Sequence, residues 1–180
     1  MHPAATAEGT PLAGALCTAC ALCCNGVLFA DVRLQSGDDA AQLAILGVSL
    51  KRRGETTRFQ QPCSCLHGNS CTIYAERPSR CRTFECRLLQ RALNDEISGQ
   101  AALQQIQQAR READNVRRIL HELGDMDETV PLSRRYQRMM RRPIDLSGDD
   151  RLVDLRGELM MSVARLMERL KRDFLTPRDD

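Results

Sequence analysis

Nine cysteine side chains supply most of the chemistry that this 180-residue chain offers. Four of them form one run with the spacing C-x-x-C-x-x-C-C: Cys17, Cys20, Cys23 and Cys24. The other five, Cys63, Cys65, Cys71, Cys81 and Cys86, lie between residues 63 and 86, and residues 87–180 contain none. Thiolates bind zinc and iron–sulfur clusters directly, commonly through short C-x-x-C turns combined with distant thiols. The two separated blocks therefore predict a metal site that is assembled by folding.

Disulfide bonding and thiol redox chemistry fit the same cysteines less well. The count of nine is odd, the adjacent thiols of Cys23 and Cys24 are poorly placed to bridge each other, and we expect a reducing compartment. Redox C-x-x-C motifs lie at a strand-to-helix junction in a βαβ unit, and no such context surrounds Cys17 and Cys20. Metal ligation is the favoured interpretation.

The spacing within each block restricts which thiols can face the same way. If the first block is helical, Cys17, Cys20 and Cys24 lie on one face and Cys23 points to the side, so that Cys23 would reach a second centre. Cys81 and Cys86 are five residues apart and do not share a face of a continuous helix. This spacing predicts a bend between them, near Phe84.

Together these motifs resemble the bacterial cysteine-cluster proteins of the YkgJ type, also called the CxxCxxCC zinc- or iron-chelating domain. The resemblance covers residues 17–87. It is carried by the first cysteine run, the C-x-x-L step from Cys63, the Cys-Thr-Ile-Tyr run at 71–74 and the segment Arg-Pro-Ser-Arg-Cys-Arg-Thr-Phe-Glu-Cys at 77–86. It implies eight ligands and leaves Cys65 as the spare thiol. The implied metal ligands are Cys17, Cys20, Cys23, Cys24, Cys63, Cys71, Cys81 and Cys86.

Eight such thiols suit two tetrathiolate zinc ions, or one iron–sulfur cluster with thiols left over. Three function classes then remain open. The first is a metal-binding protein with a structural or accessory role. The second is an iron–sulfur-dependent redox or protein-modifying enzyme component, because flagellin lysine methylases carry a similar cysteine pattern. The first class is favoured, since this short chain shows no substrate or S-adenosylmethionine signature.

The third class is a zinc-stabilised module that binds protein or nucleic acid through arginine-rich helices. Five arginines, Arg134, Arg135, Arg138, Arg141 and Arg142, fall within nine residues, although a solvated helix face gives the same pattern. The formal net charge of +2 gives no global argument for a nucleic-acid or membrane partner. Four more arginines, Arg77, Arg80, Arg82 and Arg87, lie within or beside the second block, where donation of N–H bonds to sulfur and a solvated surface position are equally consistent with the sequence.

Composition and patterning give the expected location and exposure. No stretch approaches the roughly 20 apolar residues that a membrane-crossing helix needs, and residues 1–15 lack the features of a secretory signal. We therefore expect a soluble, cytoplasmic protein. His67 lies in a polar loop between cysteines, where solvent exposure is the expectation and metal ligation the less favoured alternative.

Periodicity predicts a mainly α fold with three parts: a flexible leader (1–15), a cysteine-cluster unit (16–87) and a helical extension (88–180) packed on it. Within the unit we expect an extended segment at 27–34, a helix that starts at Asp38 and Asp39 and ends at Gly47, and a hairpin of 48–51 with 58–60. In the extension, one helix runs from a Ser98 cap to Gly124, and its apolar residues are Leu103, Ile106, Ala109, Ala113, Val116, Leu120 and Leu123. A second is capped by Ser147, with Asp149 and Asp150 in its first turn and an apolar stripe of Leu152, Leu155, Leu159, Val163, Leu166, Leu170 and Phe174.

Overall fold

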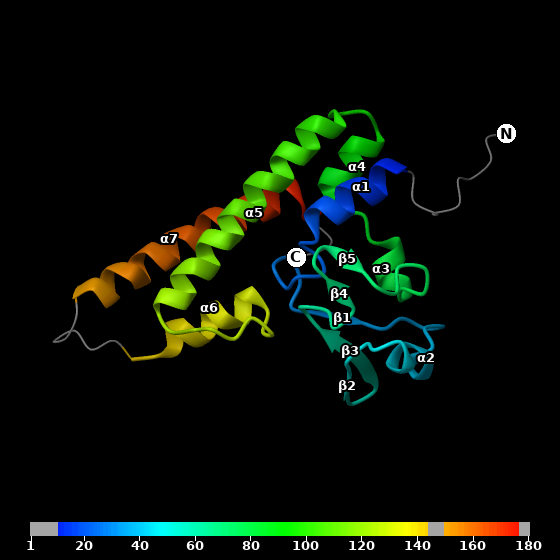
Figure 1. Ribbon diagram of the computed structural model, residues 1–180, viewed down its shortest axis with the longest axis horizontal. Helices are drawn as coiled ribbons and strands as arrows, with labels where there is room; N and C mark the ends of the chain where they lie inside the picture. Colours follow the sequence, from blue (N-terminus) through cyan, green and yellow to red (C-terminus); the bar gives the residue numbers. More distant parts are fainter. Residues whose placement is uncertain (1–10, 144–149, 177–180) are drawn as a thin grey trace.

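The computed structural model describes residues 11–143 and 150–176 and is mainly α-helical, as predicted. Two long helices lie side by side and extend away from the part of the molecule that holds the strands and most of the cysteines (Figure 1). The helices are α1 (Pro11–Cys20), α2 (Ala40–Ile45), α3 (Ser79–Thr83), α4 (Arg87–Leu93), α5 (Gly99–Glu122), α6 (Leu132–Arg141) and α7 (Asp150–Asp173). Within the described residues, no helix is both long and apolar enough to cross a membrane.

The long helices α5 and α7 pack against each other in antiparallel directions. Ser98 caps α5 as predicted, because its Oγ accepts a hydrogen bond of 3.1 Å from the Ala101 amide, and the chain leaves α5 through Gly124 at φ +81°. The predicted cap of α7, Ser147, and its neighbour Asp149 lie outside the described residues. Most of the two predicted apolar stripes are buried in one core together with parts of α1, α4 and α6.

Two residues of these stripes are exposed, contrary to the prediction. Leu103 is 37% exposed because it faces a hollow between α5 and α1. Leu152 is 47% exposed. Arg118 of α5 bonds to Glu158 of α7, and this antiparallel register places Leu152 beyond the end of α5.

A small antiparallel sheet with strand order β1-β3-β2 forms the second part of the molecule. Its strands are β1 (Asp31–Arg33), β2 (Leu50–Arg53) and β3 (Thr56–Gln60), so the predicted hairpin is confirmed. A second, two-stranded ladder joins β4 (Leu66–His67) to β5 (Ser70–Cys71). Phe59, Leu43, Val48 and Ile73 form a separate small core with the buried thiol of Cys65.

Two helix starts differ from the prediction. The first helix begins at Pro11 and so includes residues 11–15, which we assigned to the leader, while residues 1–10 lie outside the described part. The helix at 40–45 has Asp39 as its N-cap, with Oδ1 accepting from the Gln42 amide at 2.9 Å. Asp38 instead contacts a distant helix.

Candidate metal centre

The first cysteine block does not continue as a helix through Cys24, so the prediction of a shared face is wrong. Helix α1 ends at Cys20, and Ala21 then takes a left-handed conformation with φ +54° while its amide bonds to the Cys17 carbonyl. This conformation is uncommon for a residue with a side chain and redirects the chain sharply. Cys23 and Cys24 therefore lie in a turn after the helix.

Three thiols of the first block lie near Cys86. Helix α1 packs against α4, and Cys86 is the N-cap of α4, with its Sγ 3.5 Å from the Leu89 amide that it accepts from. Both Cys20 and Cys86 pack on the larger core. Burial raises the pKa of Cys23 well above its ordinary value of 9.0, and charge on Cys20 and Cys86 would raise it further. We call Cys17, Cys20, Cys23 and Cys86 the helical set.

The fourth thiol of the first block lies with the remaining cysteines instead. The Cys63 amide donates to the Cys24 carbonyl at 2.9 Å, which ties the turn after α1 to the second block. Cys71 closes the β4–β5 ladder opposite Leu66. Cys63, Cys71 and Cys81 pack against the smaller core. We call Cys24, Cys63, Cys71 and Cys81 the sheet set.

The electrostatics of the thiols couple the members of each set and also couple the two sets to each other, because charge on Cys24 contributes to the raised pKa of Cys23. Burial raises the pKa of Cys81 to about 12, with further contributions from Cys24, Cys63 and Cys71. Burial likewise raises the pKa of Cys24 to about 11, and the next contribution is a nearby charge on Cys71. Charge on Cys17 also reaches Cys24. The two sets of four thiols are therefore neighbours, and they meet where Cys23 of the helical set is followed directly by Cys24 of the sheet set.

The predicted bend between Cys81 and Cys86 is confirmed. Helix α3 ends at Thr83, Phe84 has an extended conformation with ψ 120°, and α4 starts at Arg87. The ring of Phe84 meets that of Phe29 edge-on, with ring centroids 5.0 Å apart. The bend sends Cys81 toward the sheet set and Cys86 toward the helical set.

Cys65 and His67 lie near the sheet set but in different environments. Cys65 is 3% exposed within the small core, and its thiol lies 3.7 Å from the Leu46 carbonyl oxygen. That environment suits an apolar side chain and matches the implied role of Cys65 as the spare thiol. The side chain of His67 is exposed, as expected for a polar loop.

Two arginines bring positive charge to the thiols. Arg77 is half-buried, stacks its guanidinium 3.6 Å over the Tyr74 ring and donates to the Tyr74 carbonyl at 2.8 Å. Its charge lowers the pKa of Cys17, Cys24 and Cys81, against the larger effect of burial, and so acts on both sets.

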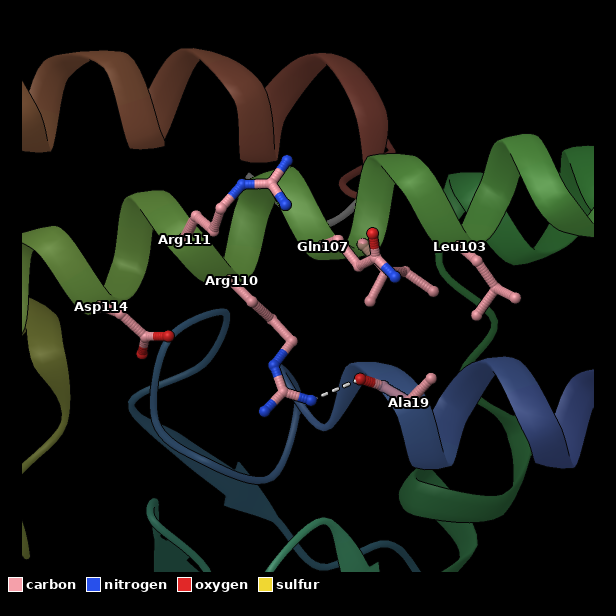
Figure 2. Close-up of a pocket in the computed structure, with 7 residues that line it drawn as sticks. Ala19, Leu103, Gln107, Arg110, Arg111 and Asp114 are labelled. Atoms are coloured by element: carbon pink, nitrogen blue, oxygen red, sulfur yellow. Dashed lines mark hydrogen bonds between the residues drawn. The ribbon is translucent and has the colours of Figure 1, made fainter.

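The second arginine, Arg110, was not among the residues selected from the sequence. It reaches from α5 across to the end of α1, where Nη1 donates to the Ala19 carbonyl at 2.6 Å (Figure 2). Its charge lowers the pKa of Cys20, although burial dominates and holds that pKa at about 12. No local signal marks Arg110, because it is one of several polar residues on α5 and meets Cys20 only through helix packing. A hollow of about 400 Å³ lies beside Arg110, and no cysteine lines it.

Asp38 positions the short helix that carries Cys81. Its Oδ1 accepts from the amide of Ser79 at 2.8 Å and from the Ser79 hydroxyl at 2.7 Å. Burial disfavours ionisation of this carboxyl, but the hydrogen bonds from Ser79 and Gln35 outweigh it and lower the pKa of Asp38. Asp38 thus caps α3 from the segment that precedes α2.

The arginine-rich segment forms α6, and three of its five arginines bond within the chain. Arg135 is buried, with Nε 3.1 Å from Asp125 Oδ1, and Arg138 contacts both oxygens of the same carboxylate. Arg134 bonds to Asp31 and so links α6 to the sheet. Arg135 is therefore not part of a solvated face, whereas the side chains of Arg134 and Arg138 stay 40% and 42% exposed beside their carboxylate partners.

The thiols are near each other but are not in place around an ion. Within residues 11–143 and 150–176, no three Cys, His, Asp or Glu side chains already form a group fit to hold a metal. The donor chemistry nevertheless suits a thiophilic metal, since each set offers four thiols. Metal binding would draw each set inward and displace the protons that burial now retains.

Comparison with known families decides the class of site. The family model described as "CxxCxxCC: Putative zinc- or iron-chelating domain" matches residues 16–114. The chain belongs to this family. The CxxCxxCC match extends beyond the 17–87 resemblance and includes α4, which Cys86 caps, and much of α5, which carries Arg110. No curated protein and no solved structure matches the chain significantly.

Proposed function

We propose that this CxxCxxCC protein binds two metal ions, one in the helical set and one in the sheet set, and that both ions are structural zinc. The observation that carries the proposal is the division of the eight implied ligands into four near α1 and α4 and four near the sheet. Cys24, bonded through its carbonyl to the Cys63 amide, begins the sheet set directly after Cys23.

Zinc is supported by the ligand count. Structural zinc sites in proteins are four-coordinate, and a tetrathiolate site leaves no position open for a substrate. Each zinc tetrathiolate carries a formal charge of −2. The positive charge of Arg77 lowers the pKa of thiols in both sets, and that of Arg110 lowers the pKa of Cys20. These arginines would partly neutralise the negative charge of each zinc centre.

The proposed role of the metal is to hold the fold together. The sheet and its small core contain few large apolar side chains. Ligation of a structural zinc contributes about 10 kcal/mol or more of apparent binding free energy, which becomes folding free energy when the site does not exist in the unfolded chain. Removal of metal is therefore expected to unfold the cysteine unit.

The test is elemental analysis together with an ultraviolet–visible spectrum of protein purified without oxygen. Two zinc ions per chain and no visible absorbance are expected. Iron and sulfide with absorbance in the visible region would replace zinc with an iron–sulfur cluster and would favour the redox or protein-modifying alternative. Less than one equivalent of any metal in folded protein would overturn the proposal.

A further inference from the structure

Helix α7 carries an unusual share of the exposed apolar surface. Of the ten exposed large apolar side chains in the described residues, five lie on this helix: Leu152, Val153, Met160, Met161 and Met167. Met160 is 50% exposed and Met161 is 63% exposed. Contiguous exposed apolar surface of this kind commonly marks an interaction site.

Three of these exposed side chains, together with two small residues, form a second regular stripe. Its members recur in alternating steps of four and three residues, the heptad spacing of paired helices: Val153, Gly157, Met160, Ala164 and Met167. The residues that pack on α5, including Leu159 and Leu166, lie on the other side of α7. Helix α7 thus has one stripe for its own chain and one directed to solvent.

The small residues of this stripe permit close approach of another helix. A Cβ built at Gly157 would meet nothing within 4 Å, so the surface over this position is open. A glycine inside an exposed helix destabilises the helix relative to alanine, and close contact with a partner helix would offset that cost. Ala164 is the other small member.

The stripe is nearly symmetric about Met160: Val153 and Met167 lie seven residues to either side, and Gly157 and Ala164 lie three and four residues to either side. In an antiparallel pairing centred there, Val153 lies opposite Met167 of a second copy, and Gly157 lies opposite Ala164 of that copy. Met160 and Met161 form the centre. A homodimer with a two-fold axis requires such a self-complementary surface.

Charges along α7 favour the same orientation. Its N-terminal half carries Asp150, Asp154 and Glu158 against Arg151 and Arg156, a net charge of −1. Its C-terminal half carries Arg165, Arg169, Lys171 and Arg172 against Glu168 and Asp173, a net charge of +2. An antiparallel partner would place Asp154 opposite Arg165 of the second copy, while a parallel partner would place like charges together.

We infer that the exposed stripe of α7 binds the same stripe of a second copy of this chain in antiparallel orientation, forming a two-fold homodimer. The contact is made by Val153, Gly157, Met160, Ala164 and Met167 and is flanked by the Asp154–Arg165 pairs. It involves none of the cysteines, so it does not depend on the identity of the metal.

The first test is the mass of metal-loaded, full-length protein by sedimentation over a range of concentrations. The wild type is expected at twice the chain mass of 20.2 kDa. Met160→Glu should raise the dissociation constant about tenfold or more, since a carboxylate would be buried without a partner. Met161→Glu, directly beside the stripe, should act alike. Met126→Glu is the matched control, because Met126 is 67% exposed but lies outside α7.

Orientation is tested by charge reversal. Asp154→Arg and Arg165→Asp should each weaken the dimer, whereas an equimolar mixture of the two variants, or the double variant, should restore it. Circular dichroism and metal content confirm that each variant is folded. A monomeric wild type at all concentrations, or a Met160→Glu variant as dimeric as the wild type, would overturn the inference. Failure of the double variant to recover would overturn the antiparallel arrangement.

Discussion

The amide of Cys63 donates to the carbonyl of Cys24 at 2.9 Å, and this bond joins the two cysteine blocks through their backbones. Cys24 is thereby placed beside the sheet, while its neighbour Cys23 stays near Cys86 of α4. The division into two sets of four leads to a direct prediction for ligand variants.

Serine at one ligand of a set should remove one metal ion and leave the other. We expect Cys20→Ser and Cys81→Ser each to lower the zinc content from two equivalents to one, because a tetrathiolate site loses most of its affinity without a thiolate. The double variant should bind none and should lack the cooperative thermal transition of the cysteine unit. Zinc content by mass spectrometry and thermal unfolding by circular dichroism are the measurements.

Cys65 supplies the control for these variants. Cys65→Ala removes a thiol of the same block, yet both zinc equivalents should remain, with a stability loss from the small core only. If Cys65→Ala lost an equivalent of zinc, or if Cys20→Ser and Cys81→Ser both kept two, the assignment of ligands would be wrong.

Asp38→Ala should loosen the helix that presents Cys81. The loss of two hydrogen bonds to Ser79 should lower stability by about 1 kcal/mol and accelerate zinc release to a competing chelator. Asp39→Ala is a matched control, since Asp39 caps α2, a helix without cysteines, through a similar bond to Gln42. Equal rates of zinc release in the two variants would show that Asp38 has no special role.

Gly26 is a point where backbone segments meet closely. It has φ +78°, and a Cβ there would lie 3.1 Å from Pro62 Cδ, 3.2 Å from Pro62 N and 3.2 Å from Pro131 Cα. Its carbonyl also accepts from the Leu132 amide at 2.9 Å, which ties α6 to the cysteine unit. A Cβ at this position would therefore require its neighbours to shift by a few tenths of an ångström.

Gly26→Ala should therefore lower the free energy of unfolding by more than the cost of the left-handed backbone conformation alone. The left-handed conformation costs a non-glycine residue about 1–2 kcal/mol, and the contacts with two prolines add to this. Gly124→Ala has a similar φ of +81° but nothing within 4 Å of the new Cβ, so it isolates the conformational cost. Urea unfolding of both variants measures the difference, and equal losses would exclude any role for the contact.

The raised thiol pKa values give a pH dependence with a defined sign. Burial raises the pKa of Cys20, Cys63 and Cys81 from 9.0 to about 12 in the folded chain. The folded state then holds protons that the unfolded state releases, so stability is present below pH 9 and is lost as the pH rises toward 12. In the metal-free chain, any folded structure of the cysteine unit should disappear across this range.

Bound zinc should abolish this loss of stability at alkaline pH, because thiolates that ligate the metal are already deprotonated in the folded state. Zinc binding at neutral pH should release protons, and acid should favour metal release. Circular dichroism against pH, with and without zinc, and proton release in weakly buffered solution are the measurements. Superimposable pH curves would argue against thiol ligation.

The sequence was sufficient for features that depend on nearby residues. The Ser98 cap, the exit through Gly124, the hairpin and the bend at Phe84 all follow from local chemistry and are confirmed. The helical continuation to Cys24 was wrong because Ala21 adopts a left-handed conformation that alanine rarely takes and that no residue type signals.

Features that depend on distant packing were not predictable in the same way. Arg110 meets Ala19 across 91 residues, and Asp38 meets Ser79 across 41, so neither contact has a signature in the chain. The charge partner of Arg135 is another such case. The segment between α5 and α6 contains several acidic residues, and only the folded structure shows that Asp125 is the one that pairs with Arg135.

The adjacency of Cys23 and Cys24 has a consequence for the order in which the proposed sites fill. The sheet set begins at Cys24 and ends at Cys81, and it is nested within the helical set, which ends at Cys86. The entropy cost of closing a loop grows with its length. Once a metal ion has closed the inner loop from Cys24 to Cys81, only the short segment from Cys81 to Cys86 remains to be ordered before the helical set is complete. A chain that emerges from the ribosome N-terminus first also completes the inner loop first. We therefore expect the ion in the sheet set to bind first and to offset most of the entropy cost of ordering the chain. The helical set would then be nearly formed when the second ion binds.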